Sequence, residues 1–171
     1  MLRFVIGGSS SGKSEYAEKL ILSMADGQAV DYMATMKCSD EETKERIKRH
    51  KDRRVGSNFI TIEKTSRVAE MIGEKHSDFA MLECVSNLLA NEMYSADPRN
   101  NPSLIAEEII SLSKEYKEFV VVSNDIFGED GLYDDSVEEY IINLGEINKI
   151  LVEKADTATE VVCGIPVEIK L

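Results

Sequence analysis

The amino-acid sequence predicts an α/β fold in which a mostly parallel sheet carries helices on both of its faces. Short apolar segments alternate along the chain with amphipathic stretches, which is the pattern of strands joined by crossover helices. No internal repeat, low-complexity tract or linker divides the sequence. Its 171 residues match the size of one ordinary α/β domain, so we expect residues 1–171 to form a single domain.

Seven short segments carry enough apolar and β-branched residues to predict strands. In chain order they are Leu2–Ile6, Ala29–Ala34, Phe59–Ile62, Phe79–Leu82, Phe119–Ser123, Glu160–Cys163 and Val167–Leu171. The first runs directly into a pair of glycines, the fifth contains three consecutive valines, and Gly164 and Pro166 separate the last two. Glycine and proline interrupt strands, so these residues set the boundaries.

Apolar residues at helical spacing between the strands predict six helices. They are Ser14–Ala25, Ser39 to about Lys51 or Asp52, Ser66–Lys75, Val85–Tyr94, Leu104–Tyr116 and Asp135–Lys154. The second begins with a capping box, in which Ser39 and Glu42 satisfy each other's backbone N–H groups. The stretches Ala96–Pro102 and Asn124–Leu132 are expected to be loops.

Composition argues against several classes of protein. Acidic residues outnumber basic ones 32 to 20, and a net charge of −12 disfavours binding to nucleic acids or to an anionic membrane surface. Cys38, Cys84 and Cys163 are odd in number and widely spaced, which predicts neither a disulfide framework nor a zinc site. The first apolar run is too short for a signal peptide, and no run reaches the roughly 18 residues of a membrane span, so we expect a cytoplasmic protein.

The strongest chemical signal is the segment Gly7-Gly8-Ser9-Ser10-Ser11-Gly12-Lys13-Ser14, which matches the phosphate-loop pattern G-x-x-x-x-G-K-[ST] between a strand and a helix. Glycines let successive backbone N–H groups converge on phosphate oxygens, and the helix adds its positive N-terminal end. Lys13 is expected to reach the β- and γ-phosphates, and Ser14 to bind Mg²⁺. The sequence therefore predicts a P-loop NTPase-like domain that binds a nucleoside triphosphate.

Polar residues also end two other predicted strands. Glu83 follows the apolar run Phe79–Leu82, where a carboxylate near the metal ion is expected, although a solvated glutamate would look the same. Asn124 and Asp125 follow the valine-rich strand. They either face the edge of the sheet where ligands bind in open α/β folds, or they form an ordinary turn.

Seven of the eleven residues from Lys44 to Arg54 are cationic, in a chain whose net charge is strongly negative. The acidic start and basic end of this predicted helix suit the helix dipole, which is a sufficient structural explanation. The cluster also suits a polyphosphate. His50 lies inside it, and neighbouring cations favour the neutral imidazole, which can attack phosphorus and form a phosphoramidate.

Together these residues resemble the adenosylcobinamide kinase/adenosylcobinamide-phosphate guanylyltransferase family, bifunctional enzymes of cobalamin nucleotide-loop assembly. The matching segments are Gly7–Ser14, Tyr32–Thr35, Asp40–Glu42, Arg46–Arg54, Leu82–Cys84 with Asn91, Val122–Asp125, Gly145 with Asn148, and Val162–Pro166. They cover essentially the whole chain. A phosphate loop alone would be generic, whereas Ala34-Thr35 followed by the Arg46-to-His50 motif at this interval is specific.

The resemblance implies phosphorylation of the aminopropanol hydroxyl of adenosylcobinamide by ATP or GTP. It then implies transfer of GMP from GTP through a GMP–His50 intermediate, giving adenosylcobinamide-GDP. With the chemistry above, it gives His50 and Lys13 catalytic roles and makes Ser14 and Glu83 the Mg²⁺ ligands. The implied nucleotide-binding residues are Gly7, Gly8, Ser9, Ser10, Ser11, Gly12, Lys13, Ser14, Ala34, Thr35, Met36, Lys51, Asp52, Arg53, Arg54, Glu63 and Glu83. The family also implies a homo-oligomer, a trimer.

Some positions depart from the family pattern. Val55 replaces a proline, Phe59 replaces a tryptophan, and residues 132–142 are acidic where the family carries a basic-aromatic element. Two other functions stay open. The first is a P-loop kinase for another small alcohol, in which His50 acts only through its charge. The second is a nucleotide-binding regulatory module with little turnover, which the absence of an N-K-x-D motif disfavours.

Overall fold

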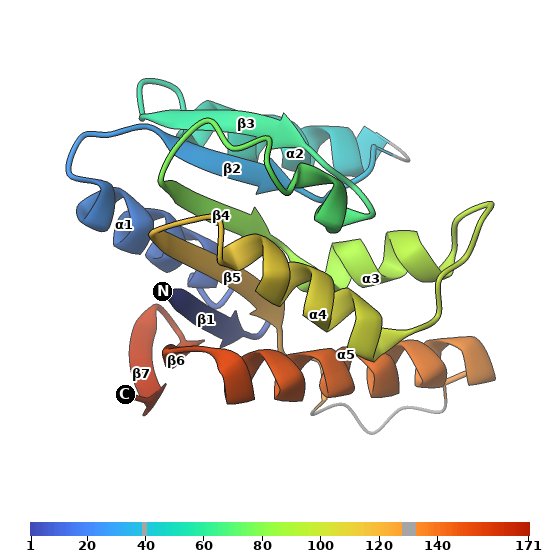
Figure 1. Cartoon of the computed structure of the whole chain (residues 1–171). Helices are drawn as coiled ribbons and strands as arrows, with labels where there is room; N and C mark the ends of the chain where they lie inside the picture. The colour runs from blue at the N-terminus through green and yellow to red at the C-terminus, as the bar shows by residue number, and fades with distance from the viewer. Residues whose placement is uncertain (39–40, 128–132) are drawn as a thin grey trace.

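The computed structural model describes residues 1–38, 41–127 and 133–171, and within helix α2 the side chains of Glu42, Thr43, Arg46, His50, Lys51 and Arg53 lie outside the described set. In this part of the chain seven strands form one sheet, in the order β3-β2-β4-β5-β1-β6-β7 (Figure 1). The strands are β1 (Leu2–Gly7), β2 (Val30–Ala34), β3 (Phe59–Glu63), β4 (Phe79–Glu83), β5 (Glu118–Asn124), β6 (Thr157–Val162) and β7 (Ile165–Lys170).

The sheet is parallel except at one edge. The pairs β1–β5, β1–β6, β2–β3, β2–β4 and β4–β5 are parallel, whereas β7 runs antiparallel to β6. Parallel neighbours need crossover connections, which the helices supply. The turn between β6 and β7 contains Cys163 and Gly164, with φ of 50° and 80°. The predicted α/β fold with a mostly parallel sheet is confirmed.

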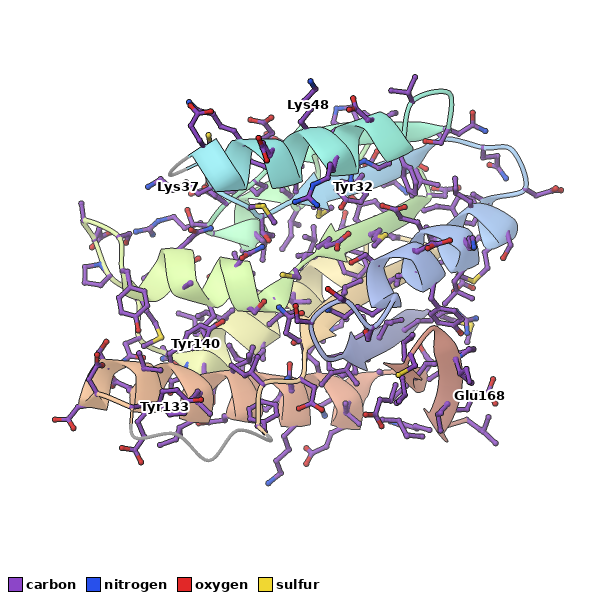
Figure 2. The ribbon with its side chains drawn as sticks, turned by 180° about the vertical axis from the view of Figure 1, so that it is seen from behind. Tyr32, Lys37, Lys48, Tyr133, Tyr140 and Glu168 are labelled. Atoms are coloured by element: carbon purple, nitrogen blue, oxygen red, sulfur yellow. The ribbon has the colours of Figure 1, made fainter. Side chains whose placement is uncertain are left out.

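Helices cover both faces of the sheet. Helices α1 (Lys13–Ala25) and α2 (Glu41–Arg53) lie on one face (Figure 2), and α3 (Val85–Met93), α4 (Pro102–Ser113) and α5 (Asp135–Lys154) lie on the other (Figure 1). Each face has its own hydrophobic core, and neighbouring residues of β1 such as Phe4 and Val5 enter different cores. This follows because successive side chains of a strand point to opposite faces. Within the described ranges, no helix combines the length and the apolar character needed to cross a membrane.

Several predicted elements differ from the structure. The helix predicted over Ser66–Lys75 is wrong, because only the 3₁₀ turn η1 (Val68–Met71) forms there. Arg67 and Gly73 flank this turn with φ of 51° and 85°, which ends helical geometry on both sides. Helix α4 begins inside the predicted loop, since Asn101 accepts a hydrogen bond from the Leu104 N–H and proline suits a first helical turn. The predicted cap at Ser39 lies outside the described residues.

The carboxyl ends of the parallel strands meet along one edge of the sheet. The register aligns Gly7 of β1 with Asn124 of β5, and Ala34 of β2 with both Glu63 of β3 and Glu83 of β4. Residues that are tens of positions apart in the sequence therefore lie side by side at this edge, which is where open α/β sheets bind their ligands.

Candidate active site

A cleft with a volume of about 1340 Å³ opens at the carboxyl ends of the parallel strands, with the phosphate loop and α2 among its walls. Thirteen residues singled out from the sequence line it: Ser9, Ser10, Ser11, Gly12, Lys13, Ser14, Ala34, Met36, Asp52, Arg54, Glu63, Glu83 and Asn124. Helix α2 contributes a further wall of the cleft, made of Lys44, Ile47, Lys48 and Arg49. The fold thus gathers most of the described candidate residues around a single space large enough for a nucleotide.

Hydrogen bonds fix the backbone of the phosphate loop. The Ser11 N–H donates to the Gly8 carbonyl oxygen at 3.2 Å, and the Lys13 N–H donates to Ser11 Oγ at 3.4 Å. The Gly164 N–H of the β6–β7 turn donates to the Ser11 carbonyl oxygen at 2.8 Å. The loop is therefore supported both by its own residues and by the far end of the chain.

Two glycines of the loop are required by geometry. Gly12 has a φ of 88°, a conformation that strains any residue with a side chain. A Cβ on Gly7 would lie 2.5 Å from Ser11 Oγ and 2.6 Å from the Val161 carbonyl oxygen. Gly7 thus allows the loop to pack directly on β6.

Positive charge gathers at the loop. Lys13 Nζ donates to the Gly8 carbonyl oxygen at 3.0 Å, which holds the ammonium group over the loop. Helix α1 begins at Lys13 without a side-chain cap, so its first N–H groups point toward the loop. Such a helix end favours bound anions, and together with Lys13 it can hold phosphate groups.

The Glu83 carboxylate lies between two hydroxyl groups. Ser14 Oγ donates to Glu83 Oε1, and the Tyr32 hydroxyl donates to Glu83 Oε2 at 2.6 Å. Burial, the Glu83 charge and this hydrogen bond raise the pKa of Tyr32 well above its ordinary value. Tyr32 consequently keeps its proton and donates throughout the physiological pH range. The structure therefore brings Ser14 and the strand-end carboxylate together.

The donors at this point fit a magnesium ion. Over the ranges that the structure covers, no cluster of three or more His, Cys, Asp or Glu side chains resembles a self-contained metal centre. Magnesium bound with a nucleotide needs less from the protein, because waters and phosphate oxygens complete its shell. The Ser14 hydroxyl and the Glu83 carboxylate are oxygen donors of the required kind.

Arg54 lies just beyond α2 and is buried against the sheet. Its guanidinium carbon is 3.6 Å from the centroid of the Tyr32 ring, and Arg54 Nη1 lies 3.8 Å from Glu18 Oε1. Tyr32 is labelled in Figure 2. Arg54 Nε and Nη1 are buried without a hydrogen-bond partner among the described residues. The aromatic ring stabilises the cation, and Arg54 lines the cleft, where its positive charge favours an anionic ligand. The side chains of His50, Lys51 and Arg53, predicted for the same site, lie outside the described residues.

Thr35 is predicted to hold the nucleotide, but its side chain is fully buried and does not line the cleft. Thr35 Oγ1 accepts from the Cys84 N–H at 2.7 Å and donates to the Cys84 carbonyl oxygen at 2.8 Å. The Asn91 side chain donates to the carbonyl oxygens of Thr35 and Thr65 at 2.8 and 2.9 Å. These contacts fix the ends of β2 and β4, so Thr35 supports the wall from behind.

Asn124 and Asp125 separate in the structure. Asn124 lines the cleft, and its amide donates to Ser86 Oγ at 2.5 Å. Asp125 accepts from the Phe127 N–H at 3.3 Å and is not on the wall of the cleft. The turn interpretation therefore applies to Asp125, whereas Asn124 faces the candidate site.

Reasoning from the residues alone missed further polar groups on the wall, among them Tyr32, Thr65 and Asn87. In the sequence Tyr32 stands out only as part of the family motif, although a tyrosine near the end of a buried strand is a signal for a polar partner at the adjoining edge. Thr65 follows β3, and Asn87 lies early in α3. Nothing in the local sequence distinguishes Thr65 from an ordinary turn residue or Asn87 from an ordinary helix residue.

The fold and the site define a P-loop nucleotide-binding protein of the α/β class. The backbone agrees with a solved structure, the flagellar accessory protein FlaH from Methanocaldococcus jannaschii, at a TM-score of 0.53 over 99% of this chain and 77% of the other. The sequences are 15% identical, so the likeness concerns the fold alone.

Sequence comparison specifies the family. The family model described as cobinamide kinase / cobinamide phosphate guanyltransferase matches residues 3–169, and the chain belongs to this family of transferases. A relative from Salmonella typhimurium, named bifunctional adenosylcobalamin biosynthesis protein CobU, is 30% identical over 99% of this chain and 100% of its own length. The protein of the same name from Escherichia coli is 29% identical over the same shares. The resemblance inferred from the motifs is confirmed.

Proposed function

We propose that this chain phosphorylates the aminopropanol hydroxyl of adenosylcobinamide with ATP or GTP and then transfers GMP from GTP, through a covalent GMP–His50 intermediate, to give adenosylcobinamide-GDP. The observation that carries the proposal is the single cleft in which the phosphate loop, the Ser14–Glu83 pair and the cationic wall of α2 meet. Membership of the family supplies the substrate class.

In the first reaction the substrate hydroxyl oxygen attacks the γ-phosphorus. The bond from that phosphorus to the bridging oxygen breaks, the nucleoside diphosphate leaves, and the hydroxyl proton is released. The loop N–H groups and Lys13 hold the triphosphate in line and stabilise the charge on its oxygens. Those N–H groups belong to Gly7, Gly8, Ser9, Ser10, Ser11 and Gly12. Lys13 acts as the catalytic cation.

In the second reaction a ring nitrogen of His50 attacks the α-phosphorus of GTP, and pyrophosphate leaves. An oxygen of adenosylcobinamide phosphate then attacks the same phosphorus, which breaks the N–P bond and restores the imidazole. His50 belongs to α2, the helix that supplies Lys44, Ile47, Lys48, Arg49 and Asp52 to the wall of the cleft, and this supports the role. Lys51, Arg53 and Arg54 would stabilise the reacting phosphate.

Mg²⁺ would be held by Ser14 and Glu83. When bound it neutralises charge on the phosphates and orients them. The proposed nucleotide site is completed by five further residues of the cleft wall: Ala34, Met36, Asp52, Glu63 and Glu83. Thr35 positions this wall from behind.

The proposal also covers the domain organisation and the oligomeric state of the protein. One sheet carries all the described strands, which supports a single domain over residues 1–171. Strand β7 is an edge strand whose apolar residues Ile165, Val167 and Ile169 are exposed, and this supports association into the homotrimer that the family resemblance implies.

Intact mass measured after incubation with GTP and Mg²⁺ tests the covalent step. We expect a gain of about 345 Da, one GMP, that is lost in acid, as a phosphoramidate requires. His50→Ala should abolish the adduct. His76→Ala is the matched control, because His76 is not on the wall of the cleft and its backbone N–H, which alanine retains, donates to Asp31 Oδ2 at 2.9 Å.

Absence of the adduct in protein that still binds GTP would overturn the transferase proposal. Transfer of the γ-phosphate to an alcohol other than adenosylcobinamide would then favour the alternative kinase. Slow hydrolysis without any acceptor would favour the regulatory module.

A further inference from the structure

Tyr32 occupies a position in the candidate site that the proposed reactions leave unexplained. Tyr32 is 2% exposed and lies on the wall of the cleft, and its hydroxyl donates to Glu83 Oε2 at 2.6 Å. The other carboxylate oxygen, Oε1, accepts from Ser14 Oγ. Each oxygen of Glu83 is thus engaged by a hydroxyl from a different element, β2 on one side and α1 on the other.

The sheet register explains why a tyrosine can make this contact. Ala34 pairs with Glu83, and Tyr32 lies two residues earlier on the same strand and so on the same face. The distance between such diagonal neighbours is within reach of a long aromatic side chain, but not of serine or threonine. Because both strands are central in the sheet, the relative positions of the two side chains are set by the backbone.

Packing holds the Tyr32 ring on two sides. The Phe59 ring lies edge-on, with centroids 5.4 Å apart and an interplanar angle of 73°. The Arg54 guanidinium lies 3.6 Å from the ring centroid. The hydroxyl is therefore presented at a fixed point, and it can fix the carboxylate that it contacts.

We infer that the Tyr32 hydroxyl is a positioning group for the metal–nucleotide complex: it holds Oε2 of Glu83, which keeps Oε1 directed at Ser14 and the metal. The inference rests on the proposed metal role of Ser14 and Glu83. In this role Tyr32 acts through Glu83, its observed hydrogen-bond partner. Partners of this kind orient metal-binding side chains, and their loss typically lowers metal affinity or activity about 10–100-fold.

Tyr32→Phe is the test, because it removes one oxygen and keeps the ring that Arg54 and Phe59 pack against. Calorimetric binding of GTP is measured in a His50→Ala background, which cannot form the covalent adduct, once with Mg²⁺ and once in EDTA, and is repeated with ATP. We expect Tyr32→Phe to weaken binding about 10-fold or more in Mg²⁺ and to leave binding in EDTA unchanged. A general loss of structure would weaken both.

Tyr116→Phe is the matched control. Tyr116 is also buried and also donates to a buried carboxylate, Asp31 Oδ2, at 3.2 Å. That pair lies at the opposite edge of the sheet, where β2 begins, so Tyr116→Phe should change neither measurement. Combined with Glu83→Gln, Tyr32→Phe should add no further loss of Mg²⁺-dependent affinity, because the two residues act through one contact.

Three results would overturn the inference. If Tyr32→Phe binds GTP like the unaltered protein in Mg²⁺ while Glu83→Gln does not, the carboxylate does not need the tyrosine. If Tyr32→Phe weakens binding equally in Mg²⁺ and EDTA, the hydroxyl is only structural. If Glu83→Gln itself leaves the Mg²⁺ dependence intact, the proposed metal role of Glu83 fails and the inference fails with it, whereas the GMP adduct remains a separate test.

Discussion

Replacing Gly7 by alanine is the sharpest test of how the phosphate loop is built. The added Cβ would lie 2.5 Å from Ser11 Oγ and 2.6 Å from the Val161 carbonyl oxygen, and real Cβ atoms essentially never approach another atom within 3.0 Å. Gly7 is not among the residues with positive φ, so the effect is steric alone.

The two obstacles differ in how easily they move. Ser11 Oγ is the end of a side chain and can rotate, although it then loses the hydrogen bond from the Lys13 N–H. The Val161 carbonyl belongs to the backbone of β6, which is held between β1 and β7. Overpacking of this kind costs about 1–3 kcal/mol. For a chain of this size each kcal/mol corresponds to about 2–4 °C, so we expect the melting temperature to fall by about 2–12 °C.

Thermal unfolding followed by circular dichroism, without nucleotide, measures the effect. Gly8→Ala is the control, because a Cβ at Gly8 meets no atom within 4 Å and Gly8 belongs to the same loop. We expect its free energy of unfolding to stay within about 0.5 kcal/mol of the unaltered protein. If Gly7→Ala melts no lower than Gly8→Ala, the close packing of the loop on β6 is wrong.

Two further predictions concern stability. Thr35→Val should lower the free energy of unfolding by about 1–3 kcal/mol, because the buried Cys84 N–H loses its partner, whereas the Cys84 carbonyl oxygen still accepts from the Leu88 N–H at 3.1 Å. Denaturant unfolding measures the change, and an equal loss in Thr61→Val, an exposed site on β3, would contradict the reasoning. The backbone N–H groups of Val137 and Ser136 lower the pKa of Asp134 at the start of α5. The ionised Asp134 carboxylate therefore stabilises the fold fully above the ordinary pKa of about 3.9, and this stabilisation is lost as the pH falls through the lower pKa of the folded state. The melting-temperature difference between the protein and Asp134→Ala should therefore shrink below about pH 4. A difference that stays constant with pH would refute this, and Asp134→Asn, which cannot titrate, supplies the reference.

Much of the fold could be predicted because its signals are local. The strand before the phosphate loop, the glycines and the helix after it are neighbours in sequence, and the structure confirms their order as β1, loop and α1. Where local signals were weak the prediction was wrong. Ser66–Lys75 has helical spacing, but positive φ at Arg67 and Gly73 confines it to the turn η1. No pattern of apolar residues reports such backbone angles.

The site divides in the same way. The sequence by itself determined that a phosphate loop, a strand-end Glu83 and a cationic helix exist, because each is a short run with its own chemistry. Only the tertiary structure decided that Tyr32 bonds to Glu83, that Thr35 turns inward and that the Gly164 N–H supports Ser11. Those contacts depend on which strands are neighbours and in what register, and pairing between segments separated by 50 or more residues is fixed by the packing of the whole sheet rather than by either segment alone.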